Sequence, residues 1–115
     1  MRSFKFAFQG ILEAVRTEHN FRFMLAFFMF VTAAGTIFGI TRGEWIAVLI
    51  CCGAVLGIEI INMAVEAAVD LAVHGENPLA KKAKDAAAGA SLVVCIFAAA
   101  VGLIIFVPYM AELFH

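Results

Sequence analysis

The chain has 115 residues, which is room for one small domain. Hydrophobic residues make up 64% of it and charged residues only 15%, whereas soluble domains are about half apolar and a quarter charged. Small domains bury the smallest fraction of their chain, so a soluble fold of this length cannot hide so much apolar surface from water. The net charge of −1, without a basic stripe, also excludes a nucleic-acid partner. Most of this chain is therefore expected to lie in lipid.

Residues 3–17 predict an amphipathic helix. Their apolar side chains recur at helical spacing, and charged or amide side chains take the opposite face, although Phe6 breaks the pattern. Such a helix lies in the membrane interface. Glu18 follows Ile11 by almost two turns and continues the apolar side, so we expect its carboxylate to point toward the helix bundle. The apolar stripe consists of Phe4, Phe8, Ile11, Leu12 and Val15.

Three longer runs are apolar enough to cross a bilayer, which takes roughly 20 residues as a helix. We place these spans at residues 21–40, 45–73 and 78–107. The second would reach about 43 Å at 1.5 Å per residue, so one end should project from the bilayer. The third is expected to begin at Asn77-Pro78, an N-cap followed by proline at the first helical position, and to end at Pro108. The predicted fold is an all-α membrane protein, one domain of three transmembrane helices behind an interfacial helix.

Basic residues predict the orientation, because Lys and Arg are enriched on the cytoplasmic side of membrane proteins. The segment before the first span and the connection between the second and third share one side, whereas Arg42 alone marks the other. We therefore expect a multi-pass protein of the cytoplasmic membrane with its N-terminus inside. The basic residues on the expected inner side are Arg2, Lys5, Arg16, Arg22, Lys81, Lys82 and Lys84.

The second span carries a stripe of polar side chains that a purely structural helix would not need. Ionisable groups at membrane depth are costly, and they usually face an interior site or a water-filled cavity. Glu59 lies two turns deeper than Glu66, roughly 10 Å along the axis. We expect Glu66 to meet ligands from water and Glu59 to meet a group presented by lipid. The stripe, at steps of three, four and four that keep one helix face, consists of Glu59, Asn62, Glu66 and Asp70.

Carboxylates from separate helices suggest a cation site. Glu18 and Glu66 suit an oxygen-loving ion such as Mg²⁺, which keeps several waters and bridges substrate phosphates. Among the lysines of the connection, only Lys84, beside Asp85 at the start of the third apolar run, is expected to act in the site. The other two are explained by topology alone.

Standard nucleotide-binding sequences are missing. The chain has no GxxxxGK[ST] and no GxGxxG sequence, so any phosphoryl transfer must use another kind of site. The GxxxG pairs Gly35–Gly39 and Gly53–Gly57, and the small residues of the run 86–91, are explained by close helix packing. The three cysteines lie inside apolar runs without metal-site spacing.

Two long motifs resemble the bacterial integral-membrane diacylglycerol kinase and undecaprenol kinase family. They are EIINMAVEAAVD at 59–70 and PLAKKAKD at 78–85, and the upstream EHNFR at 18–22 is similar to the family's Glu-x-Asn-Phe-Arg segment. The resemblance covers almost the whole chain, including the first helix and the number of spans. The loop Gly75-Glu76-Asn77 departs from the family, in which Glu-Tyr-His often stands before Pro78.

The resemblance implies a role for each matched residue. Glu59 matches the catalytic base, which takes the proton of the lipid hydroxyl, and Glu18 and Glu66 match the acidic residues that hold the metal of Mg-ATP. The family forms homotrimers with composite sites between subunits. The nucleotide contacts to be expected are Glu18, Glu66, Glu76, Asn77, Lys84 and Asp85, with Asn62 and Asp70 as supporting polar positions.

The function implied is a lipid kinase that transfers the γ-phosphate of ATP to a membrane lipid alcohol in the bacterial inner membrane. The small residues after Asp85 (AAAGA) are similar to undecaprenol kinases of Gram-positive bacteria, whereas proteobacterial diacylglycerol kinases tend to have Met-Gly-Ser-Ala. Undecaprenol is therefore the favoured substrate, and diacylglycerol is the alternative. A small proton-coupled multidrug transporter is the alternative from another class, but such proteins usually have four spans and a Glu in the first. A non-catalytic assembly subunit would leave the acidic stripe unexplained.

Overall fold

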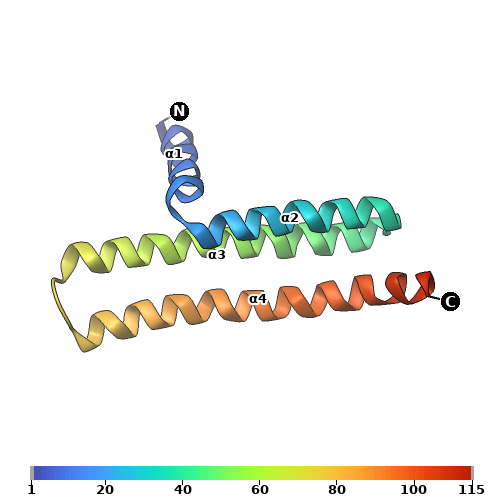
Figure 1. Ribbon diagram of the computed structural model, residues 1–115. Coiled ribbons are helices and arrows are strands. Elements are labelled where there is room, and N and C mark those ends of the chain that lie inside the picture. Colours follow the sequence, from blue (N-terminus) through green and yellow to red (C-terminus); the bar gives the residue numbers. More distant parts are fainter. Residues whose placement is uncertain (1, 115) are drawn as a thin grey trace.

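The computed structural model describes residues 2–114, and side chains from Ser3 onward, as four helices joined by short connections (Figure 1). The helices are α1 (Arg2–Thr17), α2 (His19–Phe38), α3 (Arg42–Ala72) and α4 (Pro78–Leu113). The last three are each long and apolar enough to cross a membrane. The all-helical architecture with three candidate spans is thereby confirmed.

The first helix leaves the bundle at a steep angle (Figure 1). The corner lies at Glu18, whose extended backbone separates α1 from α2. The Nη1 atom of Arg22 donates hydrogen bonds to the carbonyl oxygens of Val15 (3.3 Å) and Arg16 (3.0 Å). The last carbonyls of a helix have no partner within it, so the guanidinium satisfies two of them and ties α1 to α2. The predicted helix is present, and its place in the membrane interface stays a prediction.

The turn between α2 and α3 is held closed by a glycine and a capping box. Gly39 ends α2 with a φ of 65°, a left-handed conformation that glycine adopts without steric cost. The Thr41 hydroxyl accepts from the backbone N–H of Glu44, whose carboxylate accepts from the N–H of Thr41. Gly35 lies against the ring of Trp45, as expected of close packing. A Cβ at Gly53 or Gly57 would meet no described atom within 4 Å beyond the backbone of its own helix, so close packing among the described residues does not explain that second pair.

The fourth helix begins as expected and ends later. Asn77 Oδ1 accepts from the backbone N–H groups of Leu79 (2.9 Å) and Ala80 (3.1 Å), so the N-cap prediction is confirmed. The expectation that Pro108 ends the helix is wrong, because α4 continues to Leu113. Proline removes one backbone hydrogen bond. The turn beyond Pro108 is held by contacts that Tyr109 makes with residues outside α4.

Contacts of Tyr109 explain why the helix survives Pro108. Its hydroxyl donates to Glu44 Oε1 at 2.5 Å. Its ring stacks on Phe38 with a centroid distance of 5.8 Å. These contacts anchor the last turns of α4 to the α2–α3 turn. The small buried core lies at this same end, formed by Ile40, Val48 and Ile105.

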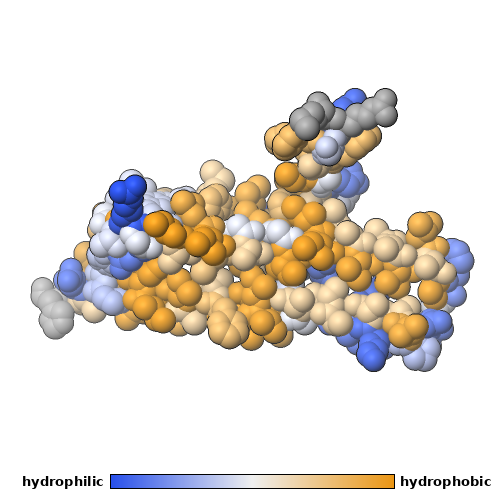
Figure 2. All heavy atoms as spheres, turned by 180° about the vertical axis from the view of Figure 1, so that it is seen from behind, coloured by the Kyte–Doolittle hydropathy of each residue, from blue (hydrophilic) through white to orange (hydrophobic). Residues whose placement is uncertain are grey.

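The long helices present apolar side chains outward. Figure 2 shows apolar residues along the length of the bundle, with hydrophilic residues gathered at both ends. Many large hydrophobic side chains are exposed in the chain, among them Ile37 at 81% and Ile104 at 74%. This distribution suits a lipid solvent, in which apolar side chains need no burial within the protein.

Candidate functional site

The polar stripe of α3 meets α4 through a hydrogen bond between Glu59 and Ser91. The Ser91 hydroxyl donates to Glu59 Oε1, and only 6% of Ser91 is exposed. The sequence prediction missed Ser91, since it stands in a run of small residues that close packing explained. One signal was present: Ser91 follows Lys84 by seven residues, almost two turns, so both occupy one face of α4.

A second contact between the same helices joins Lys84 to Asp70. The Lys84 Nζ lies 2.5 Å from Asp70 Oδ1, before the apolar part of α4 begins. Lys84 is thereby held against the end of α3. Its neighbour Asp85 does not share this contact and pairs with Lys81 of its own helix at 2.6 Å.

A polar pocket of about 740 Å³ lies where α3 ends and α4 begins. Its acidic, amide and basic side chains come from both helices and from the loop between them. It brings together five of the residues predicted for the site, whereas Glu18, Glu59, Asn62 and Glu66 are not among its lining residues. Asn77 is one of the five, and its Oδ1 is occupied by the cap of α4. The five predicted residues in the pocket are Asp70, Glu76, Asn77, Lys84 and Asp85.

Asn62 has an unsatisfied acceptor. Its Oδ1 is buried and has no hydrogen-bond partner among the residues that the structure describes. A buried acceptor left without a partner costs about 1 to 3 kcal/mol, so such atoms call for an explanation. Asn62 stands one turn from both Glu59 and Glu66 on the same face of α3. A donor or cation from outside this chain would satisfy it.

The two predicted metal ligands, Glu18 and Glu66, come from different parts of the fold. Glu18 occupies the N-cap position of α2 without a side-chain capping bond, and Glu66 is exposed on α3. Over residues 3–114, no three His, Cys, Asp or Glu side chains are close enough together to hold a metal ion. Carboxylate and amide oxygens are still the donors that a hard cation prefers, and Mg²⁺ needs only one or two protein carboxylates besides water and phosphate. The donor chemistry of Glu18, Asn62 and Glu66 therefore fits Mg²⁺.

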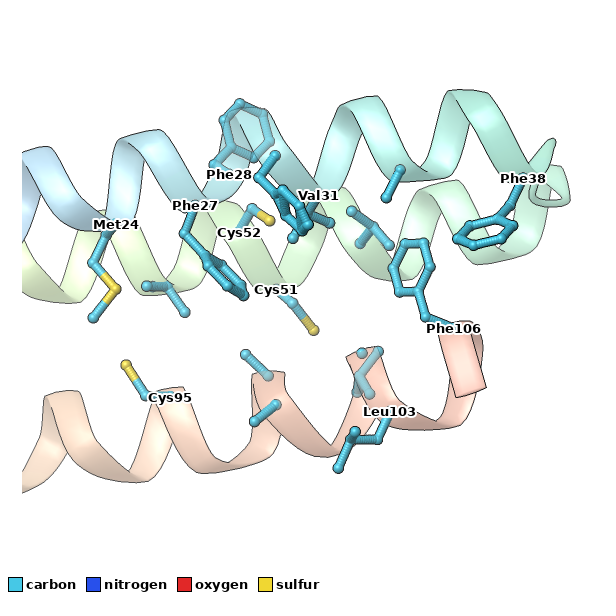
Figure 3. Close-up of a pocket in the computed structure, with 18 of the residues that line it drawn as sticks. Met24, Phe27, Phe28, Val31, Phe38, Cys51, Cys52, Cys95, Leu103 and Phe106 are labelled. Carbon is cyan, nitrogen blue, oxygen red and sulfur yellow. The ribbon is translucent and has the colours of Figure 1, made fainter. Parts of the chain in front are cut away.

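An apolar groove of about 740 Å³ runs between α2, α3 and α4. In Figure 3, Met24 and Cys95 lie at one end of the groove and Phe38 and Phe106 at the other. Cys95 follows Ser91 by one turn of α4. The groove therefore begins one turn from the Glu59–Ser91 hydrogen bond, and it is lined almost entirely by apolar side chains.

Together these features indicate one class of protein, a helical membrane enzyme with a carboxylate between an apolar groove and a charged pocket. Residues 5–106 match the prokaryotic diacylglycerol kinase family, and the chain belongs to it. It is a lipid kinase and a multi-pass bacterial membrane protein. The alternative of a proton-coupled transporter is thereby set aside.

Relatives within the family carry two different substrate names. The chain is 40% identical to the undecaprenol kinase of Bacillus subtilis over 107 residues, which cover 93% of this chain and 87% of that protein. It is 33% identical to a diacylglycerol kinase of Synechocystis over 112 residues, which cover 96% of this chain and 64% of that protein. With a diacylglycerol kinase of Pseudomonas aeruginosa it shares 31% identity over 88 residues, or 76% of this chain and 72% of that protein.

Proposed function

We propose that this lipid kinase phosphorylates undecaprenol, with ATP as the phosphate donor. The observation that carries the proposal is the position of Glu59, a carboxylate at membrane depth near one end of an apolar groove. A polar pocket lies toward the end of the same two helices. The choice of undecaprenol is supported by the identity to the Bacillus subtilis enzyme and by the small residues that follow Asp85.

The lipid alcohol enters laterally from the bilayer. Its isoprenoid tail lies in the apolar groove, and its hydroxyl reaches Glu59. One carboxylate oxygen, Oε1, is held by Ser91, while no hydrogen bond among the described residues engages Oε2. A general base must come within hydrogen-bond reach of the proton that it removes. Oε2 is therefore the oxygen that accepts the lipid proton.

The transfer forms one bond and breaks one. The lipid oxygen bonds to the γ-phosphorus while the bond from this phosphorus to the β–γ bridging oxygen breaks, which leaves ADP. Lys84 supplies positive charge to the phosphates, and Glu76, Asn77 and Asp85 contact the nucleotide from the rim of the pocket. Because Lys84 is paired with Asp70, the phosphates share or replace this partner. Charge stabilisation of this kind supplies much of the catalysis in phosphoryl transfer.

We propose Mg²⁺ as the metal, held by Glu18 and Glu66 with Asn62 and Asp70 beside them. Bound there, the ion would neutralise charge on the transferring phosphoryl group. The support is the chemistry of the donor atoms, above all the unpartnered Oδ1 of Asn62. The carboxylates of Glu18 and Glu66 make no hydrogen bond or ion pair with the described residues, so both are available as ligands.

We further propose that the active enzyme is a homotrimer with sites between subunits. The family resemblance implies this state. The glycines Gly53 and Gly57 leave an exposed strip of α3 on which no other described residue packs. The N-terminus and the loop between α3 and α4 lie on the cytoplasmic side in this proposal, where ATP is present.

The substrate is tested with radiolabelled ATP in detergent micelles that contain undecaprenol or diacylglycerol, separately and in competition. We expect undecaprenol to be phosphorylated faster and to suppress labelling of diacylglycerol. Faster labelling of diacylglycerol in the competition would overturn the choice of lipid. The catalytic base is tested by Glu59→Gln, which keeps the shape and the oxygen that accepts from Ser91 but loses the basic site. We expect kcat to fall by about 10²- to 10⁴-fold.

The matched control for the base is Glu13→Gln, since Glu13 is an exposed carboxylate on α1 outside the site. This variant should keep the rate of the natural enzyme. Full activity in purified Glu59→Gln would remove the base assignment, whatever the lipid.

A further inference from the structure

We propose that Ser91 is the positioning residue of the catalytic carboxylate, which it holds in one orientation through the hydrogen bond to Oε1. This inference rests on the proposed role of Glu59 as the base. The two side chains come from different helices, α3 and α4, and are 32 residues apart in the sequence. Ser91 is the polar residue that remains buried in a stretch made otherwise of alanine and glycine.

A glutamate on a membrane helix needs such a partner if it is to act as a base. Its side chain has three rotatable bonds, and its carboxylate must stay within hydrogen-bond reach of one lipid proton. Misplacement by about 1 Å can cost a factor of 10² in rate. Throughout residues 3–114, Ser91 is the one group that hydrogen-bonds Glu59. No ion pair holds this carboxylate either within the described residues.

The helices that carry the pair are suited to fixing it. α3 and α4 pack along each other, and their charged ends are joined by Lys84 and Asp70. Ser91 has a short side chain with a single rotatable bond to its hydroxyl oxygen, so the position of its backbone largely fixes the position of this donor. The hydrogen bond from Ser91 therefore fixes the end of the longer Glu59 side chain relative to α4.

The bond also determines which oxygen is used. With Oε1 occupied, Oε2 is left to accept the proton of the lipid hydroxyl. Without Ser91 the carboxylate would sample several rotamers, and only some would bring an oxygen to the lipid hydroxyl. The loss should therefore appear in kcat, because binding of ATP and of the lipid tail depends on other side chains.

A purely structural hydrogen bond is the competing explanation. Serine hydroxyls often join helices within membranes and contribute modestly to their association. In that case the removal of the hydroxyl would lower stability and leave the rate of the folded enzyme unchanged. The two explanations differ in kcat.

The test compares Ser91→Ala, Ser91→Thr and Glu59→Gln in the full chain, with ATP and undecaprenol in detergent micelles. We expect Ser91→Ala to lower kcat by about 10- to 100-fold, with each KM changed less than about threefold. Ser91→Thr keeps a hydroxyl and should recover most of the rate. The matched control is Thr36→Val, which removes a hydroxyl that donates to the Thr32 carbonyl within α2. The rate of this variant should be unchanged.

The outcomes separate this inference from the proposed base. If Glu59→Gln is inactive while Ser91→Ala keeps its kcat within about twofold, the base stands and the positioning role of Ser91 is refuted. If Glu59→Gln is fully active, the proposed base is wrong and the role of Ser91 fails with it. Thermal unfolding of each variant by circular dichroism is the second measurement. A loss of rate in Ser91→Ala that Ser91→Thr does not recover, together with a lower melting temperature, would refute positioning.

Discussion

Replacing Gly35 with alanine would place a methyl group against the ring of Trp45, where α2 packs closely on α3. An added Cβ would lie 2.8 Å from Cη2 and 3.0 Å from Cζ2 of Trp45, and 3.0 Å from Cδ1 of Ile40. Carbon atoms in van der Waals contact are normally about 3.5 to 4.0 Å apart. The ring has little room to retreat, because Trp45 packs on the core of Ile40, Val48 and Ile105.

The expected magnitude follows from two opposing effects. Overpacking a close contact typically costs about 1 to 3 kcal/mol. Replacing a glycine inside a helix by alanine stabilises the folded protein by about 0.5 to 1 kcal/mol. The middle values of these two ranges differ by about 1 kcal/mol, so Gly35→Ala should lower the free energy of unfolding by about this amount.

The matched control is Gly10→Ala in α1, where a Cβ would meet no described atom within 4 Å beyond the backbone of its own helix. Without overpacking, this variant should gain stability by about 0.5 to 1 kcal/mol. Both variants would be unfolded in a mild detergent by added sodium dodecyl sulfate, with helicity followed by circular dichroism. If Gly35→Ala matched or exceeded the stability of the natural chain, the close contact at Trp45 would be refuted. A destabilised Gly53→Ala variant would support the proposed packing of Gly53 on another subunit.

Two further predictions concern the proposed metal site and the corner between α1 and α2. Glu66→Gln should raise the Mg²⁺ concentration that gives half-maximal rate by about tenfold, because an amide is a weaker ligand than a carboxylate. An unchanged Mg²⁺ titration would count against Glu66 as a ligand. Arg22→Ala should free the carbonyls of Val15 and Arg16 and cost about 1 kcal/mol at the α1–α2 corner. Trypsin should then cleave faster after Arg16, and cleavage at the natural rate would show that the corner does not depend on this guanidinium.

Local sequence signals were sufficient for the helices. Long apolar runs and the Asn77-Pro78 pair predicted three candidate spans and the start of α4, because helix formation and capping depend on residues within a few positions of each other. The end of α4 was predicted wrongly for the same reason. Pro108 signals a helix end locally, whereas the Tyr109 contacts that extend the helix come from α2 and α3.

The polar stripe of α3 was visible in the sequence, since helical periodicity alone puts Glu59, Asn62 and Glu66 on one face. The partners of this stripe were not visible. Ser91 hydrogen-bonds Glu59, and Lys84 pairs with Asp70 instead of with its neighbour Asp85, because of the register of α4 against α3. This register is set by side-chain packing between helices, which no spacing within one helix encodes.

By itself, the sequence determined that this protein lies in a membrane as helices, and it showed which face of α3 carries the polar stripe. Hydropathy and periodicity are properties of single segments, so they can be read without knowing how the segments meet. Only the tertiary structure decided what that face meets. Ser91 of α4 lies beside Glu59, and an apolar groove begins one turn away. Those contacts join residues far apart in the chain, and they exist only once two helices have packed in one register.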